Sequence, residues 1–360
     1  MIRMQIDNEI RPGANCYISE AHALANLPSL LAPFNHPIIV TGTQSWAAFT
    51  ANYDGDFTYP KYQYDGSASD EDAARIAAAE PTADVVIGIG GGRALDTAKD
   101  TAQQLHAEVI LVPTLASNCA PYTPIGAIYH HDQHTFKRVA YFERSAYATV
   151  VDWQVMLTTP RAYFIAGIGD TLAKWYELDG IVETLDTPLP AFNRLAEVSA
   201  LLIQETLVAD AEPALADLAA QKITPAFINI VDAIIGLAGT IGGFGVHYGR
   251  IAGAHAIHNG LSYLPETQPI LHGAKVAYGI LVQLAYTNHT DEITNLLPLY
   301  QRLGLPTNLA ALHVTDQSVA ALTPVAAFAS GPDESFRLID PHVTADKILT
   351  AMQAVEKLTA

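Results

Sequence analysis

Three histidines and one acid have the chemistry to bind a divalent metal. They are His255 and His258 in GAHAIHNG, His272 in LHGAKVAYG and, far upstream in AGIGDTLAKW, Asp170. Imidazole and carboxylate are ligands of borderline divalent metals, and an open position on such a metal can polarise an alcohol or carbonyl oxygen. Single histidines are also common as packed or capping residues. The residues alone leave a metal site and an ordinary helical core both open.

A run of glycines, Gly90, Gly91 and Gly92, separates the apolar stretch DVVI from a helical pattern. Without Cβ atoms the backbone can approach a ligand closely and adopt positive φ, and the next helix would point its N-terminal amides at an anion such as pyrophosphate. The dinucleotide pattern GxGxxG is not met, because Arg93 takes the place of its last glycine. The run predicts either a phosphate-binding loop or a tight turn.

Two charged residues, Asp96 and Lys99, follow on one face of the same predicted helix. The lysine could neutralise a phosphate, and the aspartate could accept a hydrogen bond from a hydroxyl group. An ordinary surface ion pair of i,i+3 type explains the spacing equally well.

Alternating strands and helices must position these residues in the first 150 positions. Short continuous apolar runs between helical patterns are typical of a parallel sheet that is covered on both faces. The expected strands are His36–Gly42, Asp84–Gly90, Glu108–Thr114 and Tyr147–Asp152, and the expected helices are Ser45–Tyr53, Asp70–Glu80 and Arg93–His106.

Long helical patterns dominate from the TTP stretch at Thr158–Pro160 onward. The sequence therefore predicts an α/β domain with a parallel sheet over residues 1–158, followed by an all-helical domain over residues 159–360. The first would be of the nucleotide-binding type.

Composition narrows the class of protein. The chain has 360 residues, 50% of them hydrophobic and 16% charged, with a formal net charge of −18. Such a chain is globular, and its negative field disfavours nucleic acid and anionic lipid as partners. Two cysteines, Cys16 and Cys119, are too few for a disulfide framework. The charged N-terminus and the Gly-rich, short apolar stretch Val231–Val246 predict a cytoplasmic protein with no membrane segment.

Five motifs in order resemble glycerol dehydrogenase and its relatives in the metal-dependent, iron-type alcohol and polyol dehydrogenase superfamily. They run from Gly88 to Leu284, and two of them are most similar to the bacterial hydroxycarboxylate dehydrogenase branch. The motifs are GIGGGRALDTAK, VPTLASNCAPYTPIGAIYH, GIGDTLAKWYE, AHAIHNGLSYLPET and HGAKVAYGILVQL.

This resemblance implies a nicotinamide dinucleotide and one divalent metal. The cofactor-binding residues that it implies are Gly90, Gly91, Gly92, Asp96, Lys99, Thr114, Leu115, Ser117 and Tyr129. The metal ligands that it implies are Asp170, His255 and His272. Hydride would pass between a substrate carbon and the nicotinamide ring, and His258, facing the substrate, or a metal-linked water would relay the proton.

Two departures from the family pattern concern metal and substrate. Lys174 stands where iron-type members carry a further histidine, which leaves three protein ligands and favours zinc. Cys119 stands where glycerol dehydrogenases have an acid that meets the polyol, which weakens the case for a polyol. Because Lys174 lies one turn after Asp170, it could bind a substrate carboxylate, so we predict a 2-oxo or 2-hydroxy acid. Equally, Lys174 could pair with Asp170 or Glu177.

A third departure concerns the dinucleotide. NAD-preferring members often place an acid after the glycine that ends the first strand, and here that residue is Thr43. Threonine does not repel a 2′-phosphate, so NAD and NADP both stay open.

Other functions stay open beside the acid dehydrogenase. Glycerol or another vicinal diol is the first alternative substrate class. A dehydroquinate synthase-like lyase would need more basic residues near the helical motifs, and a non-catalytic dinucleotide-binding protein would not need the metal ligands. The family resemblance also implies a homo-oligomer.

Overall fold

The computed structural model describes residues 9–132 and 135–359, and the chain divides into two compact units. The α/β unit comprises Arg11–Arg161 and Ala216–Thr240, and the helical unit includes Ala162–Leu215 and Ile241–Ala360. The sequence did not predict that a later segment, 216–240, clusters with the α/β unit. The functional division at residues 158 and 159 stays a prediction.

In the described part of the α/β unit, six parallel strands form one sheet in the order β1-β8-β5-β4-β2-β3. The strands are β1 Tyr17–Glu20, β2 Pro37–Thr41, β3 Lys61–Gln63, β4 Val85–Gly90, β5 Glu108–Pro113 and β8 Ala148–Asp152. The helices of the first 161 residues are α1 Leu27–Leu31, α2 Thr43–Thr50, α3 Asp70–Ala79, α4 Gly92–Leu105 and α5 Trp153–Met156. The α/β class and the parallel sheet are confirmed.

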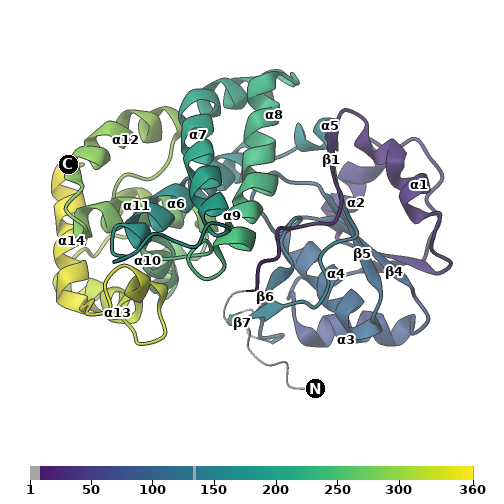
Figure 1. Ribbon diagram of the computed structural model, residues 1–360, viewed down its shortest axis with the longest axis horizontal. Helices are drawn as coiled ribbons and strands as arrows, with labels where there is room; N and C mark the ends of the chain where they lie inside the picture. The colour runs from purple at the N-terminus through teal and green to yellow at the C-terminus, as the bar shows by residue number, and fades with distance from the viewer. Residues whose placement is uncertain (1–8, 133–134, 360) are drawn as a thin grey trace. The chain divides into compact units, whose positions relative to one another are not determined.

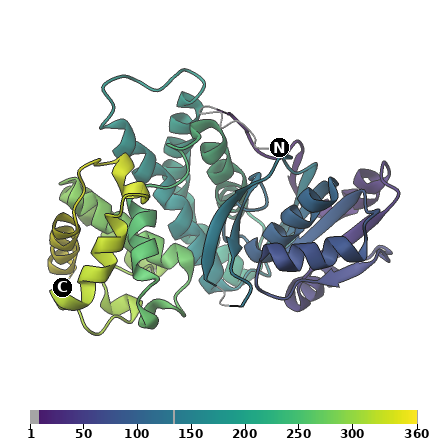
Figure 2. The same ribbon diagram turned by 90° about the horizontal axis from the view of Figure 1, so that it is seen from below.

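The central strands are rich in apolar residues because both faces of the sheet are covered. Every residue of β2, β4 and β8 is buried. Helix α4 packs on β4 and β5 and lies beside α3 (Figure 2). Its Leu95 and Ala98 join Val86 and Leu111 of the sheet in one core cluster.

The sheet reverses its direction of winding between β2 and β4. From β2 the chain passes through α2 to β3 on one side, and from β4 it passes through α4 to β5 on the other. The hydroxyl of Thr41 in β2 donates to the carbonyl of Ile89 in β4 over 2.8 Å. Helices α2 and α4 therefore begin next to each other, at the position where open α/β sheets bind ligands.

Four strands were not predicted. Strand β1 and the three-residue β3 lie at the edges of the sheet, and β3 has no buried residue. The other two, β6 Ile125–Tyr129 and β7 Phe136–Tyr141, form an antiparallel hairpin that pairs Ile125 with Tyr141. Only one residue of β7 is buried. Short or exposed strands lack the apolar run that reveals a central strand.

The helical unit is built from long helices, as predicted. They include α6 Arg161–Val182, α7 Arg194–Ala220, α10 Gly253–Leu261, α11 His272–Tyr286, α12 Thr290–Leu303, α13 Val319–Ala329 and α14 Ala345–Leu358. Helix α10 packs on α11 and α13, and α11 packs on α12 and α14 (Figure 1). Helix α8 (Pro225–Asp232) lies in segment 216–240, which belongs to the α/β unit. Helix α9 (Ala238–Gly245) begins in this segment and ends in the helical unit.

Glycines allow three of these helices to cross closely. A Cβ on Gly273 of α11 would lie 1.8 Å from the carbonyl oxygen of Ala166 in α6. A Cβ on Gly279 would lie 2.2 Å from the carbonyl oxygen of Ala254 in α10. Any larger residue would push these backbones apart, so α6, α10 and α11 meet only because glycine occupies the crossings.

One continuous helical stretch of the described chain, Pro225–Gly245, is long and apolar enough to cross a membrane by length and composition. Half of its most apolar window is buried inside the structure. The core helix of a globular unit passes the same test, so the expected absence of a membrane segment stays a prediction.

Candidate active site

Three predicted ligands, Asp170, His255 and His272, come together in the helical unit. One ligand atom of each lies within 4.8 Å of the others. Nε2 of His255 is 3.3 Å from Oδ1 of Asp170, and Nε2 of His272 is 3.1 Å from the same oxygen. Two imidazole nitrogens thus face one carboxylate oxygen, and this donor set fits a borderline divalent cation.

Each ligand comes from a different helix of the glycine-mediated crossing. Asp170 lies in the middle of α6, His255 in the first turn of α10, and His272 is the first residue of α11. The side chains of Asp170 and His255 are about nine-tenths buried, whereas that of His272 is 51% exposed. Two of the three ligands are therefore buried, and a small molecule could approach the cluster from the side of His272.

The charges of the cluster shift the protonation of its members. Burial opposes the ionisation of Asp170, but the charge of His272 and the hydrogen bond with His255 hold its pKa well below the ordinary value. Burial also opposes a charged His255, but the carboxylates of Glu177 and Asp170 raise its pKa to about 9. The pocket thus favours positive charge between two acids, which is the charge that a cation would supply.

Glu177 is a member of the site that the sequence did not single out as functional. Its Oε2 lies 2.8 Å from Nδ1 of His255, and the side chain is 3% exposed. It stands about two helical turns after Asp170, so both acids lie on one side of α6. The sequence motif GIGDTLAKWYE contains this spacing. Only the position of His255 on another helix shows that Glu177 contacts a metal-binding candidate.

His258 lies beside His272. Its Nε2 is 3.0 Å from Nδ1 of His272, and its Nδ1 is 3.0 Å from the side-chain oxygen of Asn259. The amide of Asn259 in turn donates to Glu334 over 3.1 Å. Burial and the charge of His272 hold the pKa of His258 well below its ordinary value. The neutral ring is placed to orient His272, and its role as a proton relay stays a prediction.

Lys174 lies on α6 between the two acids. Its ammonium group is buried and donates to the backbone carbonyl of Arg250. Burial opposes the ionisation of Glu177, and the charge of Lys174 helps that of His255 to lower the pKa of this carboxyl. An ammonium group has three hydrogens, so this carbonyl leaves donors for another acceptor.

The glycine run lies where β4 ends and α4 begins. Gly90 is the last residue of β4, Gly91 is the N-cap of α4 with φ −87° and ψ −179°, and Gly92 is the first helical residue. A Cβ on Gly90 would lie 2.6 Å from Cβ of Ala94, so strand and helix pack too closely for a side chain. Gly91 does not use the positive φ that glycine permits, because the chain enters the helix through extended backbone.

The start of α4 has free hydrogen-bonding capacity in the described structure. The helix has neither a side-chain cap nor an acid in its first turn. The first amides of a helix lack intrahelical partners, and their positive dipole end favours an anion. A 14-residue helix that begins uncapped at the switch point of the sheet fits a pyrophosphate.

Asp96 and Lys99 form an ion pair of 2.8 Å, as one reading of the sequence predicted, but the pair is buried and not on the surface. Oδ2 of Asp96 accepts from the amide of Ala127 in the hairpin over 3.0 Å. The ammonium of Lys99 donates to the backbone carbonyls of Ala120 and Thr123, before the hairpin, and of Ile125, its first residue. These contacts give the pair a structural role, and their contact with a cofactor stays a prediction.

The remaining predicted cofactor residues lie around the carboxyl ends of the central strands. Thr43 is exposed at the first position of α2, and Thr114 directly follows β5. A Cβ on Gly91 would lie 3.0 Å from the side chain of Leu115. The guanidinium of Arg93 lies 4.8 Å from the centroid of the Tyr129 ring.

Ser117 and Cys119 lie in the loop between β5 and the hairpin, and both are half-buried. The carbonyl of Cys119 accepts from the amides of Tyr122 and Thr123 over 3.0 and 3.2 Å. The structure thus places both residues on the loop whose later carbonyls, those of Ala120 and Thr123, accept from Lys99. A substrate contact of Cys119 stays a prediction.

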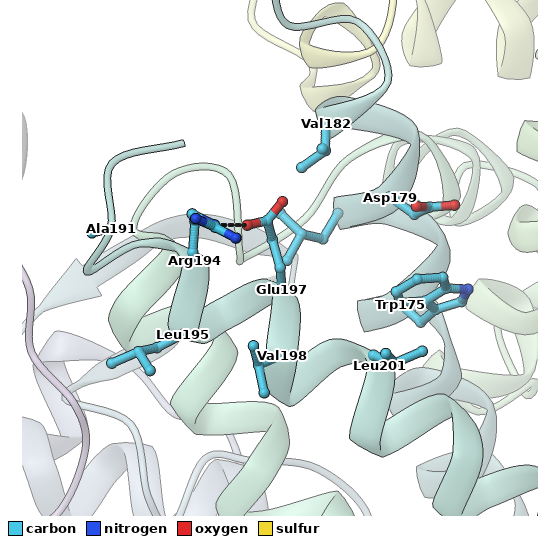
Figure 3. Close-up of a pocket in the computed structure, with 10 residues that line it drawn as sticks. Trp175, Asp179, Val182, Ala191, Arg194, Leu195, Glu197, Val198 and Leu201 are labelled. Atoms are coloured by element: carbon cyan, nitrogen blue, oxygen red, sulfur yellow. Dashed lines mark ion pairs between the residues drawn. The ribbon is translucent and has the colours of Figure 1, made fainter. Parts of the chain in front are cut away.

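A groove of about 470 Å³ lies elsewhere on the helical unit, between α6 and α7. Figure 3 shows Trp175 and Asp179 from α6 and Leu201 from α7 along it, with Arg194 paired to Glu197 over 3.6 Å. None of the predicted site residues lines this groove. This groove is therefore separate from the predicted site residues.

Comparison with known proteins decides the family. The pattern of the family described as "Iron-containing alcohol dehydrogenase" matches residues 14–153. Hydroxycarboxylate dehydrogenase A of Escherichia coli is 40% identical over 296 residues, which cover 82% of this chain and 81% of that protein. The chain belongs to the iron-containing alcohol dehydrogenase family. It is therefore an alcohol oxidoreductase by descent.

Further family members cover nearly the whole chain. A glycerol dehydrogenase of Thermotoga maritima is 32% identical over 363 residues, which cover 98% of this chain and 97% of that protein. The crystal structure of a probable glycerol dehydrogenase from Sinorhizobium meliloti has a TM-score of 0.86 and 27% identity, covering 98% of this chain and 99% of that one. The iron-type alcohol dehydrogenase fold predicted from the sequence is confirmed.

Proposed function

We propose that this family member is a metal-dependent, NAD(P)-linked oxidoreductase that interconverts a small 2-oxo acid and the corresponding 2-hydroxy acid. The observation that carries the proposal is the position of Lys174 on α6, one turn after Asp170, in the helix that also bears Glu177. A cation beside the three-ligand cluster suits a substrate with a carboxylate next to its reacting carbon.

Asp170, His255 and His272 would hold one divalent cation, and three protein ligands of this type favour zinc. The cation, when bound, would supply Lewis acidity toward an alcohol or carbonyl oxygen. Asp170 contributes the negative charge of the site, and its low pKa keeps it ionised. His258 and Glu177 orient the two imidazole rings through the hydrogen bonds described above.

The α/β unit would bind the dinucleotide. The uncapped start of α4 supports pyrophosphate binding at Gly91 and Gly92. Thr43, exposed at the start of α2, neither repels nor strongly attracts a 2′-phosphate, so NAD and NADP are both compatible. The cofactor supplies the hydride chemistry, and the protein supplies binding, orientation and exclusion of water.

Glycerol or another vicinal diol is the second candidate substrate. The names of the relatives in Thermotoga maritima and Sinorhizobium meliloti favour it, whereas the name of the Escherichia coli relative favours the acid. The residues favour the acid too, because Cys119 replaces a polyol-binding carboxylate and Lys174 adds a cation. A lyase or a non-catalytic binding protein would require that no carbonyl compound is turned over.

Steady-state kinetics tests the proposal directly. The zinc-loaded enzyme is assayed with 2-oxobutanoate and NADH or NADPH, and with glycerol and NAD or NADP, beside a chelated sample. We expect kcat/KM for the 2-oxo acid to exceed that for glycerol, and chelation to abolish both. Faster turnover of glycerol would reject the acid assignment, and full activity after chelation would reject the metal.

The remaining parts of the proposal concern assembly and location. We propose a cytoplasmic homo-oligomer, as the family resemblance implies, that binds neither nucleic acid nor membrane. The net charge of −18 supports the absence of nucleic acid and anionic lipid as partners. Analytical ultracentrifugation over a range of concentrations measures the assembly. A protein that sediments as a monomer at all concentrations would contradict it.

A further inference from the structure

We propose that Glu177 is a positioning residue of the metal site, which fixes the ring of His255 so that Nε2 carries the lone pair toward the cation. The inference rests on the proposed metal site, and it assigns a role to a residue outside the three ligands. It also explains why the first turn of α10 is tied to α6.

Glu177 uses both of its oxygens on one short segment. Oε1 accepts from the backbone amides of Ala252 over 2.7 Å and His255 over 2.9 Å, and Oε2 lies 2.8 Å from Nδ1 of His255. The residue is 2% exposed. One carboxylate thus holds both the backbone and the side chain of His255, which leaves the imidazole little freedom to rotate.

The backbone contacts cap helix α10 from outside. Ala252 is its N-cap and offers no side-chain cap, so the first amides of α10 need partners from elsewhere. Glu177 of α6 accepts from two of them, and Oε1 of Gln283 in α11 accepts from the amide of Ala254 over 3.1 Å. The helices that carry Asp170 and His272 therefore also hold the start of the helix that carries His255.

The side-chain contact decides the tautomer. A carboxylate can only accept, so a hydrogen bond at 2.8 Å requires that Nδ1 of His255 carries the hydrogen. The neutral ligand form then has its lone pair on Nε2, which is the nitrogen that faces Asp170. Outer carboxylates of this kind orient metal-binding histidines in general and make them better donors.

The substitution Glu177→Gln tests the tautomer without changing the size of the side chain. The side-chain oxygen of glutamine can still accept from the backbone amides. Its NH2 group would then face Nδ1 of His255 and could donate only to a nitrogen without a hydrogen. The hydrogen would move to Nε2 and oppose metal binding. We expect the dissociation constant for Zn²⁺ to rise about 10- to 100-fold, measured by competition with a chromophoric chelator.

Gln283→Met is the matched control, because Gln283 caps the same helix through the amide of Ala254, whereas Glu177 also binds the ring of His255. Loss of its cap at Ala254 and of its 2.6 Å bond to the carbonyl of Tyr176 should lower the Tm of the metal-free protein by about 2–4 °C. Its dissociation constant for Zn²⁺ should stay within about threefold of the wild-type value. Glu177→Gln should show the reverse pattern, with a small change in Tm and a large change in affinity.

The outcomes are distinguishable. Zinc affinity of Glu177→Gln equal to that of the wild type, or equal losses of affinity in both variants, would overturn the positioning role and leave the proposed function intact. A wild-type protein that binds no zinc would overturn the metal site itself, and this inference with it. Should Glu177→Gln fail to fold, Glu177→Asp keeps the acceptor and must bind zinc more weakly than the wild type for the inference to stand.

Discussion

The buried pair Asp96–Lys99 and the cluster Asp170–His255–His272 both place charged side chains inside the protein, but they use them differently. Around Lys99 the ammonium group is surrounded by backbone carbonyls and one carboxylate. Around Asp170, two imidazole nitrogens point at a single carboxylate oxygen. The first arrangement pairs the charge with backbone carbonyls. The second gathers three groups that can bind a cation once both imidazole rings are neutral.

This difference gives a criterion for a site that residue types alone do not supply. A buried charge whose partners lie on the backbone stabilises a local structure. Imidazole and carboxylate groups gathered in one small space can bind a divalent cation. Glu177 and His258 add to the contrast, because each holds the outer nitrogen of a ligand ring and leaves the inner one available.

The largest effect is expected from a substitution in the cluster Asp170–His255–His272, called the open cluster below. Asp170→Asn removes the charge that two histidines share, so we expect kcat/KM to fall at least about 10³-fold, since a catalytic metal contributes several kcal/mol. Steady-state kinetics and the metal content of the purified variant measure this. Asp179→Asn, an acid on the same helix that lines the other groove, should stay within about twofold; wild-type activity in Asp170→Asn would refute the cluster.

Removal of one charge from the buried pair Asp96–Lys99 should lower the stability of the protein. Lys99→Met leaves Asp96 buried without its cation and three carbonyls without a donor, so we expect a loss of about 3–5 kcal/mol in the free energy of unfolding. Chemical denaturation followed by circular dichroism measures it.

The double variant Asp96→Asn/Lys99→Met sharpens this result, because removal of both charges is less costly than removal of one. We expect it to be more stable than Lys99→Met alone. A double variant less stable than the single one would contradict the closed arrangement of this pair.

Lys174 resembles both regions, since its ammonium group donates to the carbonyl of Arg250 and its charge also acts on His255 and Glu177. If a substrate carboxylate uses its remaining donors, Lys174→Met should lower kcat/KM for 2-oxobutanoate about 10- to 100-fold and that for glycerol less than about threefold. The exposed Lys357→Met on α14 serves as a control. Equal losses for both substrates would make Lys174 a purely structural residue.

Asp100, next to Lys99 in α4, gives the smallest effect. Burial and the charge of Asp70 raise its pKa to about 6, although a hydrogen bond with Gln104 and two nearby cations lower it. The folded state therefore holds this proton more tightly than the unfolded state, whose carboxyl has a pKa of about 4. The stability of the wild type falls as the pH rises between these two values.

The variant Asp100→Asn is neutral at every pH and avoids this loss. We expect it to be more stable than the wild type by about 1 kcal/mol at pH 8, with the gain shrinking toward pH 4. Urea denaturation at pH 5 and pH 8 measures the difference. A gain that does not depend on pH would show that the carboxyl does not titrate as its burial requires.

Much of this molecule could be predicted from local patterns. Apolar runs such as IIVT and VVIGIG revealed the central strands because both of their faces are buried. Edge strand β3 and hairpin strand β7 were missed because exposed strands carry no such run. The ligand residues were found from their types and from a resemblance spread over the chain.

The outer residues could not be found in that way. In the sequence, Glu177 is one more acid on a helix, and only the fold places His255 of α10 beside it. Lys99 could equally lie on the surface, and only the fold covers it with the hairpin. His255 beside Glu177 and the carbonyls around Lys99 are remote in sequence, so no local spacing predicts these contacts.

The sequence by itself determined the α/β-then-helical order, the buried strands, the glycine turn and the four side chains able to bind a metal, because these depend on local periodicity and residue chemistry. Only the tertiary structure decided which charges close on the backbone and which face each other. That choice depends on how closely the helices cross, and glycines at contacts such as Gly273 with Ala166 set the distance.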